Sequence, residues 1–354
     1  MASISRAKKV SVMAMVPKPD ATSLLHGGDL TAARQEFPHA PQPFIDLSTG
    51  INPHPYPLPQ LSPDIFARLP QRDALERLLA AAAKAYGAPS PDHVVAAPGT
   101  QILLPTVAAV GARMSCGLAK ILGPTYAEHA GAAYLAGYNT IGVTGLAELE
   151  GANLAVVVNP NNPDGRMVSR GALIAIANKL RTGGLLVVDE AFADAAPPDA
   201  SLASEVARGN IIVLRSFGKF FGLAGLRLGF ALAAPAIATV LTSWLGPWAV
   251  SGPAIAIGEA ALGDTPWAQA TRAMLHRDAQ RLEEMLSQAG LEIVGGTPLF
   301  RLARTPAARE LYHHLGRAGI FVRRFTEQSD WLRFGLPGNE DAWSRLRTAL
   351  AAFT

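Results

Sequence analysis

Three stretches decide the fold class of this chain of 354 residues: 154–165 (LAVVVNPNNPDG), 185–190 (LLVVDE) and 211–219 (IIVLRSFGK). Each begins with four or five consecutive apolar residues, rich in the β-branched side chains that favour strands. Uninterrupted apolar strands are typical of a mostly parallel sheet that helices cover on both faces. Each stretch then turns polar where the strand ends, and ligand sites of parallel sheets gather at that edge.

The sequence around these stretches continues the alternation of strands and helices. We expect further strands at His93–Ala97 and Ala119–Leu122, and helices at Gln101–Arg113, Tyr126–Ala136 and Ser169–Leu180. Ser169 is a residue type that caps helix N-termini. The segment before about Pro57, rich in Pro and Gly, is expected to be extended and irregular.

The pattern changes after Pro266. A long amphipathic helix is expected over Ala268–Ala289. Short strands near Glu292, Phe300, Val322 and Leu332 then alternate with helices at Ala307–Ala318 and Asn339–Ala352. This order indicates a separate, smaller α+β domain.

Charge and hydropathy exclude two classes of partner. The net charge is only +3 and the basic residues are scattered, so nucleic-acid binding is not expected. Leu228–Gly258 carries no charged residue, yet prolines and glycines divide it into pieces too short to span a bilayer. We expect two short buried helices there, at a domain junction or a subunit interface, and no membrane partner.

The single cysteine bears on the compartment. Cys116 rules out an internal disulfide framework and a cysteine-rich metal site, and no metal is expected. One cysteine fits a reducing compartment, so we expect a cytoplasmic protein with Cys116 as a buried, small apolar residue. Met1–Val16 has basic residues before a short apolar run but no small-x-small cleavage site, so a secretory leader is not expected.

Chemically useful residues follow several expected strands. Lys219 follows one strand, and a lysine at such a position can form a Schiff base. Asp189 follows another, and a carboxylate can pair with a pyridinium nitrogen. Gly99-Thr100 opens a helix whose backbone N–H groups can hold a phosphate. Together these residues indicate a cofactor site at one edge of the sheet.

The motifs resemble those of fold-type I pyridoxal-phosphate enzymes, in the class I and II aminotransferase superfamily. Ser216-Phe217-Gly218-Lys219 with Gly225-Leu226-Arg227 resembles the lysine signature, and 159–165 and 189–191 match in order and spacing. The resemblance implies a mostly parallel seven-stranded sheet in a large domain over 57–260. It also implies a small C-terminal domain over 261–354, which the segment 1–56 joins, and a homodimer.

The resemblance also implies roles for individual residues around pyridoxal 5'-phosphate. Lys219 would carry the cofactor as a Schiff base and move protons, and Asp189 would pair with the ring nitrogen. Asn162 would bond the ring O3′, and Tyr126 would stack on the ring. The cofactor phosphate would be held by Gly99, Thr100, Gln101, Ser216 and Arg227. Arg333 matches an arginine that binds a substrate carboxylate.

Three positions depart from the pattern. Phe192 stands where the family motif Asp-Glu-Ala-Tyr has tyrosine, and Gly218 stands where a serine or threonine is frequent. Gly50 stands where some relatives have an asparagine that contacts substrate, and Asn52 is a weak candidate to replace that contact.

The N-terminal part resembles the threonine-phosphate decarboxylase branch of cobalamin biosynthesis, through Leu25–Leu30 (LHGGDL) and Phe44–Pro53 (FIDLSTGINP). This implies decarboxylation of O-phospho-L-threonine to aminopropanol phosphate. It also implies substrate contacts from His26, Gly27, Asn162, Arg323 and Arg333. A histidinol-phosphate-type aminotransferase and a catalytically idle binding subunit remain as alternatives, although intact Lys219, Asp189 and Arg227 argue against the second.

Overall fold

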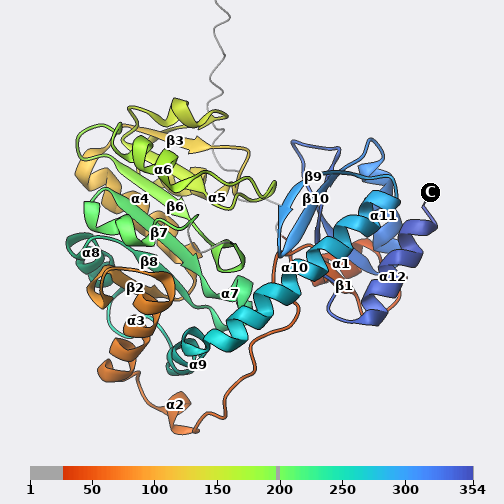
Figure 1. The fold of residues 1–354 in the computed structure, drawn as a ribbon, viewed down its shortest axis with the longest axis horizontal. Helices are drawn as coiled ribbons and strands as arrows, with labels where there is room; N and C mark the ends of the chain where they lie inside the picture. The colour runs from red at the N-terminus through yellow and green to blue at the C-terminus, as the bar shows by residue number, and fades with distance from the viewer. Residues whose placement is uncertain (1–26, 197–199, 354) are drawn as a thin grey trace, which may run out of the picture.

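The larger part of the fold is a seven-stranded sheet flanked by helices (Figure 1), seen in a computed structural model that describes residues 27–196 and 200–353. In sheet order, its strands are β2 (Val94–Ala97), β8 (Gly229–Leu232), β7 (Ile211–Ser216), β6 (Leu185–Asp189), β5 (Leu154–Val158), β3 (Leu118–Leu122) and β4 (Asn139–Val143). Only β8 is antiparallel to its neighbours; the other pairs are parallel. The prediction of a mostly parallel seven-stranded sheet is confirmed.

Helices bury both faces of this sheet. Every residue of β5 is buried, and successive residues of that strand belong to opposite faces: Leu154 and Val156 pack on one cluster, Ala155 and Val157 on another. One face is covered by α4 (Thr100–Ser115), α5 (Glu128–Leu135) and α8 (Pro235–Leu245), the other by α3 (Arg72–Tyr86), α6 (Arg170–Ala177) and α9 (Gly252–Gly263). This is why β5 is apolar at every position, as are the first four residues of β6 and of β7.

The smaller sheet has five strands, in the order β1 (Ile45–Leu47), β11 (Ile320–Arg324), β12 (Trp331–Gly335), β10 (Phe300–Arg304) and β9 (Glu292–Thr297). Its helices are α1 (Leu30–Glu36), α11 (Ala308–Arg317) and α12 (Glu340–Ala351). The long helix α10 (Thr265–Gln288) runs from beside the larger sheet to the smaller one (Figure 1). Because β1 pairs in parallel with β11, a segment from near the N-terminus becomes part of a sheet built otherwise from C-terminal strands.

Several expectations about elements need correction. The segment before Pro57 is not wholly irregular, because it holds α1 and β1. The strands β4 and β8 and the helix α3 were not expected. Asn and Gly weaken the strand pattern of β4, an edge strand of the sheet, and β8 lies inside the uncharged stretch interpreted as helical.

The uncharged stretch 228–258 forms β8, α8 and most of α9, so two short helices are confirmed and a strand is added. The helix α8 is not wholly buried, since its residues Val240 and Trp244 are 37% and 41% exposed, and Trp248, between the two helices, is 59% exposed. No helix within residues 27–196 and 200–353 is long and apolar enough to cross a membrane.

Two further observations concern the cysteine and the N-terminus. Cys116 is exposed, not buried as expected, because it follows the last residue of α4 and is not part of the face that this helix packs on the sheet. Its thiol donates to the carbonyl oxygen of Gly137 at 3.6 Å. Met1–Val16 and His26 lie outside the described residues. Among the described residues, no group of three or more His, Cys, Asp or Glu side chains is arranged to hold a metal ion.

Candidate active site

The carboxyl ends of the parallel strands form one wall of a cavity of about 490 Å³. Asp189 ends β6 and Ser216 ends β7. Because β8 runs the opposite way, its first residue, Gly229, pairs with Ser216 and with Ala97 at this same edge. Arg227, two residues before Gly229, therefore reaches the cavity that the strand ends line.

A buried ion pair ties two of these strand ends together. Arg215 on β7 donates to Glu190 at 2.8 Å and also bonds Asp194. The three side chains are at most 7% exposed. Since Glu190 follows Asp189 and Arg215 precedes Ser216, the pair holds both site residues at a fixed separation.

Lys219 lies in α7 (Phe217–Phe220), a one-turn helix that follows β7 directly. Its ammonium group is 5.9 Å from the ring centroid of Phe192. Burial, and next the charge of Arg333, lower the pKa of Lys219 to about 8. About a tenth of this amine is therefore uncharged and nucleophilic at pH 7, far more than of an ordinary lysine.

The backbone of this turn is held from a distant segment. Asn52 donates its backbone N–H to the carbonyl of Lys219 and its side-chain amide to that of Phe220, each at 2.9 Å. The side-chain oxygen of Asn52 accepts from His54 at 2.9 Å. Asn52 is 1% exposed and does not line the cavity, so it does not replace the substrate contact that Gly50 lacks.

Asp189 has a partner that the sequence analysis missed. Its Oδ2 lies 2.8 Å from Nε2 of His129, on α5, and its Oδ1 accepts from the backbone N–H of Ala191 at 3.0 Å. Both side chains are at most 8% exposed. The only signal in the sequence was a histidine three residues after Tyr126, which is weak without the fold.

The beginning of α4 and Arg227 form a cradle at the far end of the cavity. Gly99 caps α4 with φ 85°, and a Cβ there would lie 2.6 Å from Nη2 of Arg227. A Cβ on Gly229 would lie 2.5 Å from the backbone nitrogen of Thr100. Because both positions are glycine, the guanidinium of Arg227 and the first backbone N–H groups of α4 can lie close together. Together these groups can bind an anion.

Tyr126 lies over the same region. Its hydroxyl donates to the side-chain oxygen of Gln101 at 2.9 Å, and the amide of Gln101 donates to Glu128 at 3.1 Å. Burial raises the pKa of Tyr126 to about 12, so the phenol is neutral at physiological pH. The hydrogen bond to Gln101 holds the ring of Tyr126 at the edge of the cavity.

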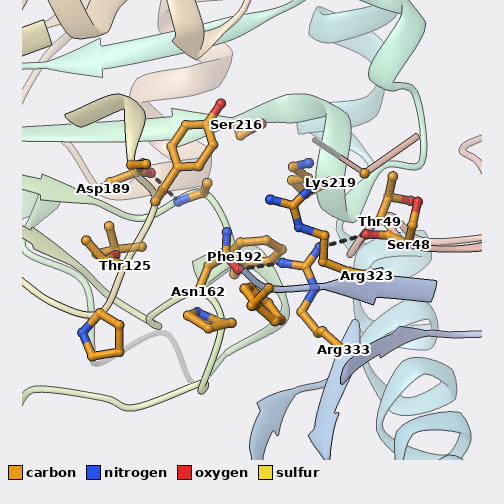
Figure 2. A pocket seen from close by; sticks show the side chains of 18 of the residues that line it. Ser48, Thr49, Thr125, Asn162, Asp189, Phe192, Ser216, Lys219, Arg323 and Arg333 are labelled. Carbon is orange, nitrogen blue, oxygen red and sulfur yellow. Dashed lines mark hydrogen bonds between the residues drawn. The ribbon is translucent and has the colours of Figure 1, made fainter. Parts of the chain in front are cut away.

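The smaller sheet contributes two arginines. Arg323 on β11 and Arg333 on β12 are direct cross-strand partners. Arg333 donates to Oδ1 of Asn162 and, at 2.9 Å, to the carbonyl of Ser48, while its buried Nε has no partner among the described residues. Figure 2 shows Lys219, Arg323 and Arg333 around one space, with Asp189 on its other side. Burial, and next the neighbouring Arg323, lower the pKa of Arg333.

Two departures from the family pattern have a steric reason. A Cβ on Gly218 would lie 2.8 Å from Cα of Ala224, so no serine or threonine fits. A Cβ on Gly50 would lie 2.9 Å from ring atoms of both Phe192 and Phe300.

The structure brings together almost all of the predicted site residues. Those that line the cavity are Gly27, Thr100, Gln101, Tyr126, Asn162, Asp189, Ser216, Lys219, Arg227, Arg323 and Arg333. Gly99 contacts it through Arg227. Only His26 falls outside the described residues. Ser48, His129 and Phe300 surround the site without having been predicted.

Comparison with known proteins agrees with this geometry. Threonine-phosphate decarboxylases from Sinorhizobium sp and Pseudomonas aeruginosa are each 42% identical to this chain, over 93% of it and 98% of their own length. The solved structure of histidinol-phosphate aminotransferase from Sinorhizobium meliloti in complex with pyridoxal-5'-phosphate has a TM-score of 0.76. It is 20% identical and covers 99% of this chain and 100% of its own, which shows a shared fold.

The family model for aminotransferases of class I and II matches residues 44–350, a range that includes both sheets and nearly every residue of the cavity described above. The chain belongs to the class I and II aminotransferase family.

Proposed function

We propose that this chain is a pyridoxal-phosphate-dependent decarboxylase that converts O-phospho-L-threonine to (R)-1-aminopropan-2-yl phosphate, a step of cobalamin biosynthesis. The similarity to two threonine-phosphate decarboxylases over almost the whole chain supports this reading. The reaction consumes one proton and releases CO2.

One observation carries the proposal: two arginines lie directly opposite each other across β11 and β12 and face the lysine. Like charges at such a position destabilise a sheet. Neither Arg323 nor Arg333 forms an ion pair with a carboxylate in residues 27–196 and 200–353, and Nε of Arg333 is buried without a partner there. A substrate with two anionic groups, a carboxylate and a phosphate, would neutralise both.

The residues of the cavity also fit pyridoxal phosphate. The cradle of Gly99, Thr100 and Arg227 would hold its phosphate, with Gln101 and Ser216 beside it. Asp189, oriented by His129, would hold the ring nitrogen protonated. Asn162 would bond O3′, Tyr126 would stack on the ring, and Lys219 would form the covalent link.

Pyridoxal phosphate, when bound, would supply an electron sink for the breaking of one bond of the substrate Cα. The two anionic groups would be held by Arg323 and Arg333, with Gly27 and His26 of the N-terminal segment. These contacts would orient the substrate and so determine which bond breaks. A remote phosphate contact can provide the energy for this orientation. After CO2 leaves, Lys219 is placed to donate the proton that Cα takes up.

Three broader features belong to the same proposal. The chain is a cytoplasmic homodimer, with the uncharged stretch 228–258 partly at the subunit interface or domain junction. The exposed Trp244 and Trp248 in or near α8 support this placement. The segment 1–56 joins a small domain over 261–354, and 57–260 is the cofactor-binding domain; the pairing of β1 with β11 supports that division.

An assay of the purified enzyme with bound cofactor distinguishes decarboxylation from amino transfer. It is incubated with O-phosphothreonine while CO2 is measured, beside histidinol phosphate with a 2-oxoacid. Release of CO2 from the first supports the proposal, and faster amino transfer in the second contradicts it. Borohydride reduction and peptide mapping should place the cofactor on Lys219; a label on another lysine would contradict the site.

A further inference from the structure

Ser48 lies between two groups that are proposed to contact the substrate, Gly27 and Arg333. It follows β1 directly, is 0% exposed and lies in the wall of the cavity (Figure 2). Its carbonyl oxygen accepts from Nη2 of Arg333 at 2.9 Å, and its hydroxyl oxygen accepts from the backbone N–H of Gly28 at 2.7 Å. One buried residue therefore contacts both the arginine of the smaller sheet and the N-terminal segment that carries Gly27.

Asp46 determines how Ser48 is oriented. Its Oδ1 accepts from the backbone N–H of Ser48 at 2.8 Å and from the hydroxyl of Ser48 at 2.6 Å. The first of these bonds closes an Asx turn, which sets the direction of the chain at Ser48. Because a carboxylate only accepts hydrogen bonds, the single hydroxyl hydrogen goes to Asp46, and the hydroxyl oxygen is left to accept from Gly28. We call Asp46 and Ser48 the Asp–Ser pair.

The backbone around the Asp–Ser pair is closely packed. A Cβ on Gly27 would overlap the carbonyl oxygen of Ser48, the same oxygen that Arg333 bonds. A Cβ on Gly335, at the end of β12, would overlap the carbonyl oxygen of Thr49. Gly27 and the strand that carries Arg333 therefore pack on consecutive carbonyl groups of one turn, and a shift of this turn would displace both.

The guanidinium of Arg333 depends on this turn for its orientation. Nη1 donates to the side-chain oxygen of Asn162 and Nη2 to Ser48, so acceptors on two different nitrogens fix the plane of the group. Burial, and next the charge of Arg323, lower the pKa of Arg333, whereas the charge of Asp46 acts in the opposite direction. Asp46 is thus close enough to influence Arg333, although the hydrogen bonds between them run through Ser48.

We propose that Asp46 and Ser48 are positioning residues that hold Gly27 and Arg333 in one arrangement, so that a ligand with two anionic groups meets both; this rests on the proposed function. When the Asp–Ser pair is broken, the ligand must also order the turn, which weakens binding and leaves the cofactor cradle intact. The hydrogen bonds of Asp46 carry the role, and not its charge, because a negative charge near the site repels an anion.

Three variants, Ser48→Ala, Asp46→Ala and Asp46→Asn, separate the hydrogen bonds from the charge. The probe is the 2-hydroxy analogue of O-phosphothreonine, which has both anionic groups but no amine and cannot react. By calorimetry on the holoenzyme, the two alanine variants should bind it about tenfold more weakly, the size of one lost hydrogen bond. Asp46→Asn keeps an acceptor oxygen and removes the negative charge, so it should bind the analogue at least as tightly as the parent. The double alanine variant should bind no more weakly than the weaker single variant, because the two residues act as one unit.

A matched control distinguishes positioning from a general loss of stability. Ser115 accepts from the side chain of Asn153 at 2.7 Å, much as Ser48 accepts from Gly28, but it ends α4 at the opposite end from the residues that line the cavity. Ser115→Ala should lower the midpoint of urea unfolding and leave the affinity for the analogue unchanged. In Ser48→Ala, the KM for O-phosphothreonine should rise about tenfold, while kcat stays within about threefold of the parent. The affinity for pyridoxal phosphate should not change.

Parent-like affinity for the analogue in both alanine variants would overturn the proposal. An Asp46→Asn protein that binds as weakly as Asp46→Ala would also overturn it, since the charge and not the hydrogen bonds would then matter. If one alanine variant does not fold, the other is judged alone by the same measurements. A parent that releases no CO2 and does not bind the analogue refutes the proposed function instead. The Asp–Ser pair is then judged with the same variants on the histidinol phosphate or 2-oxoacid that the parent does bind.

Discussion

Replacing Lys219 with methionine should make the cofactor-free protein more stable, although it abolishes catalysis. Methionine has a similar length and no charge, so it keeps the packing against Phe192 and removes the buried amine. The structure lowers the pKa of Lys219 from 10.5 to about 8, mainly through burial and next through the charge of Arg333. Such a shift means that folding disfavours the protonated lysine.

The size of the effect follows from the shift. At about 1.4 kcal/mol per pKa unit, the cost of the charged lysine has an upper limit of about 3.4 kcal/mol. Because the side chain keeps some contact with water, about 1–3 kcal/mol is expected at neutral pH. This is a large part of the 5–15 kcal/mol by which a domain is typically stable.

The pH dependence has a definite sign. Below about pH 8 the lysine is protonated in both states, so the full cost is present. Between about 8 and 10.5 the unfolded chain still binds the proton and the folded chain does not, so the parent gains stability as the pH rises. Above 10.5 the cost is gone, and the difference between parent and Lys219→Met should vanish.

Urea unfolding of the cofactor-free proteins between pH 7 and 10.5 measures this difference. Lys84→Met, at an exposed position of α3, is the matched control and should change stability by less than about 0.5 kcal/mol. A Lys219→Met protein that is less stable than the parent at pH 7 would refute the reasoning. So would a stability difference that does not depend on pH.

Three further predictions concern the residues around this lysine. Arg323→Ala should keep the cofactor and lose about ten- to a hundredfold in kcat/KM for O-phosphothreonine, with some abortive transamination, because one anion contact is gone; decarboxylation at the parent rate in steady-state assays would contradict the site. His129→Leu removes the partner 2.8 Å from Asp189, so cofactor affinity, measured by fluorescence titration, should fall about tenfold; an unchanged affinity would mean that the pair is not needed. Asn52→Asp replaces the donor to Phe220 with an acceptor and should cost about 1–3 kcal/mol in urea unfolding, with no loss expected if the contact is dispensable.

Local patterns were sufficient for most strands of the larger sheet and for much of its functional edge. Apolar runs ending in Asp189 or Ser216 depend only on residues adjacent in the chain, and burial on both faces demands such runs wherever they are placed. The order of motifs around Lys219 likewise pointed to the family. The elements that were missed carry weak local signals, as in the edge strand β4.

Contacts between distant segments were decided only by the tertiary structure. The antiparallel direction of β8 brings Arg227 to the cavity, and the register of β11 and β12 sets Arg323 opposite Arg333. The burial of His129 against Asp189 depends in the same way on how helix and sheet pack.

Gly50 shows the difference most clearly. In the sequence it is a missing side chain, and the departure at Phe192 is an unrelated missing hydroxyl 142 positions later, counting from 50 to 192. In the structure the two positions are neighbours, because the rings of Phe192 and Phe300 fill the space beside Gly50. Periodicity and propensity report which local conformation and which burial a segment favours. They carry no information on which distant side chain fills a given space, because that is settled by close packing of the whole chain.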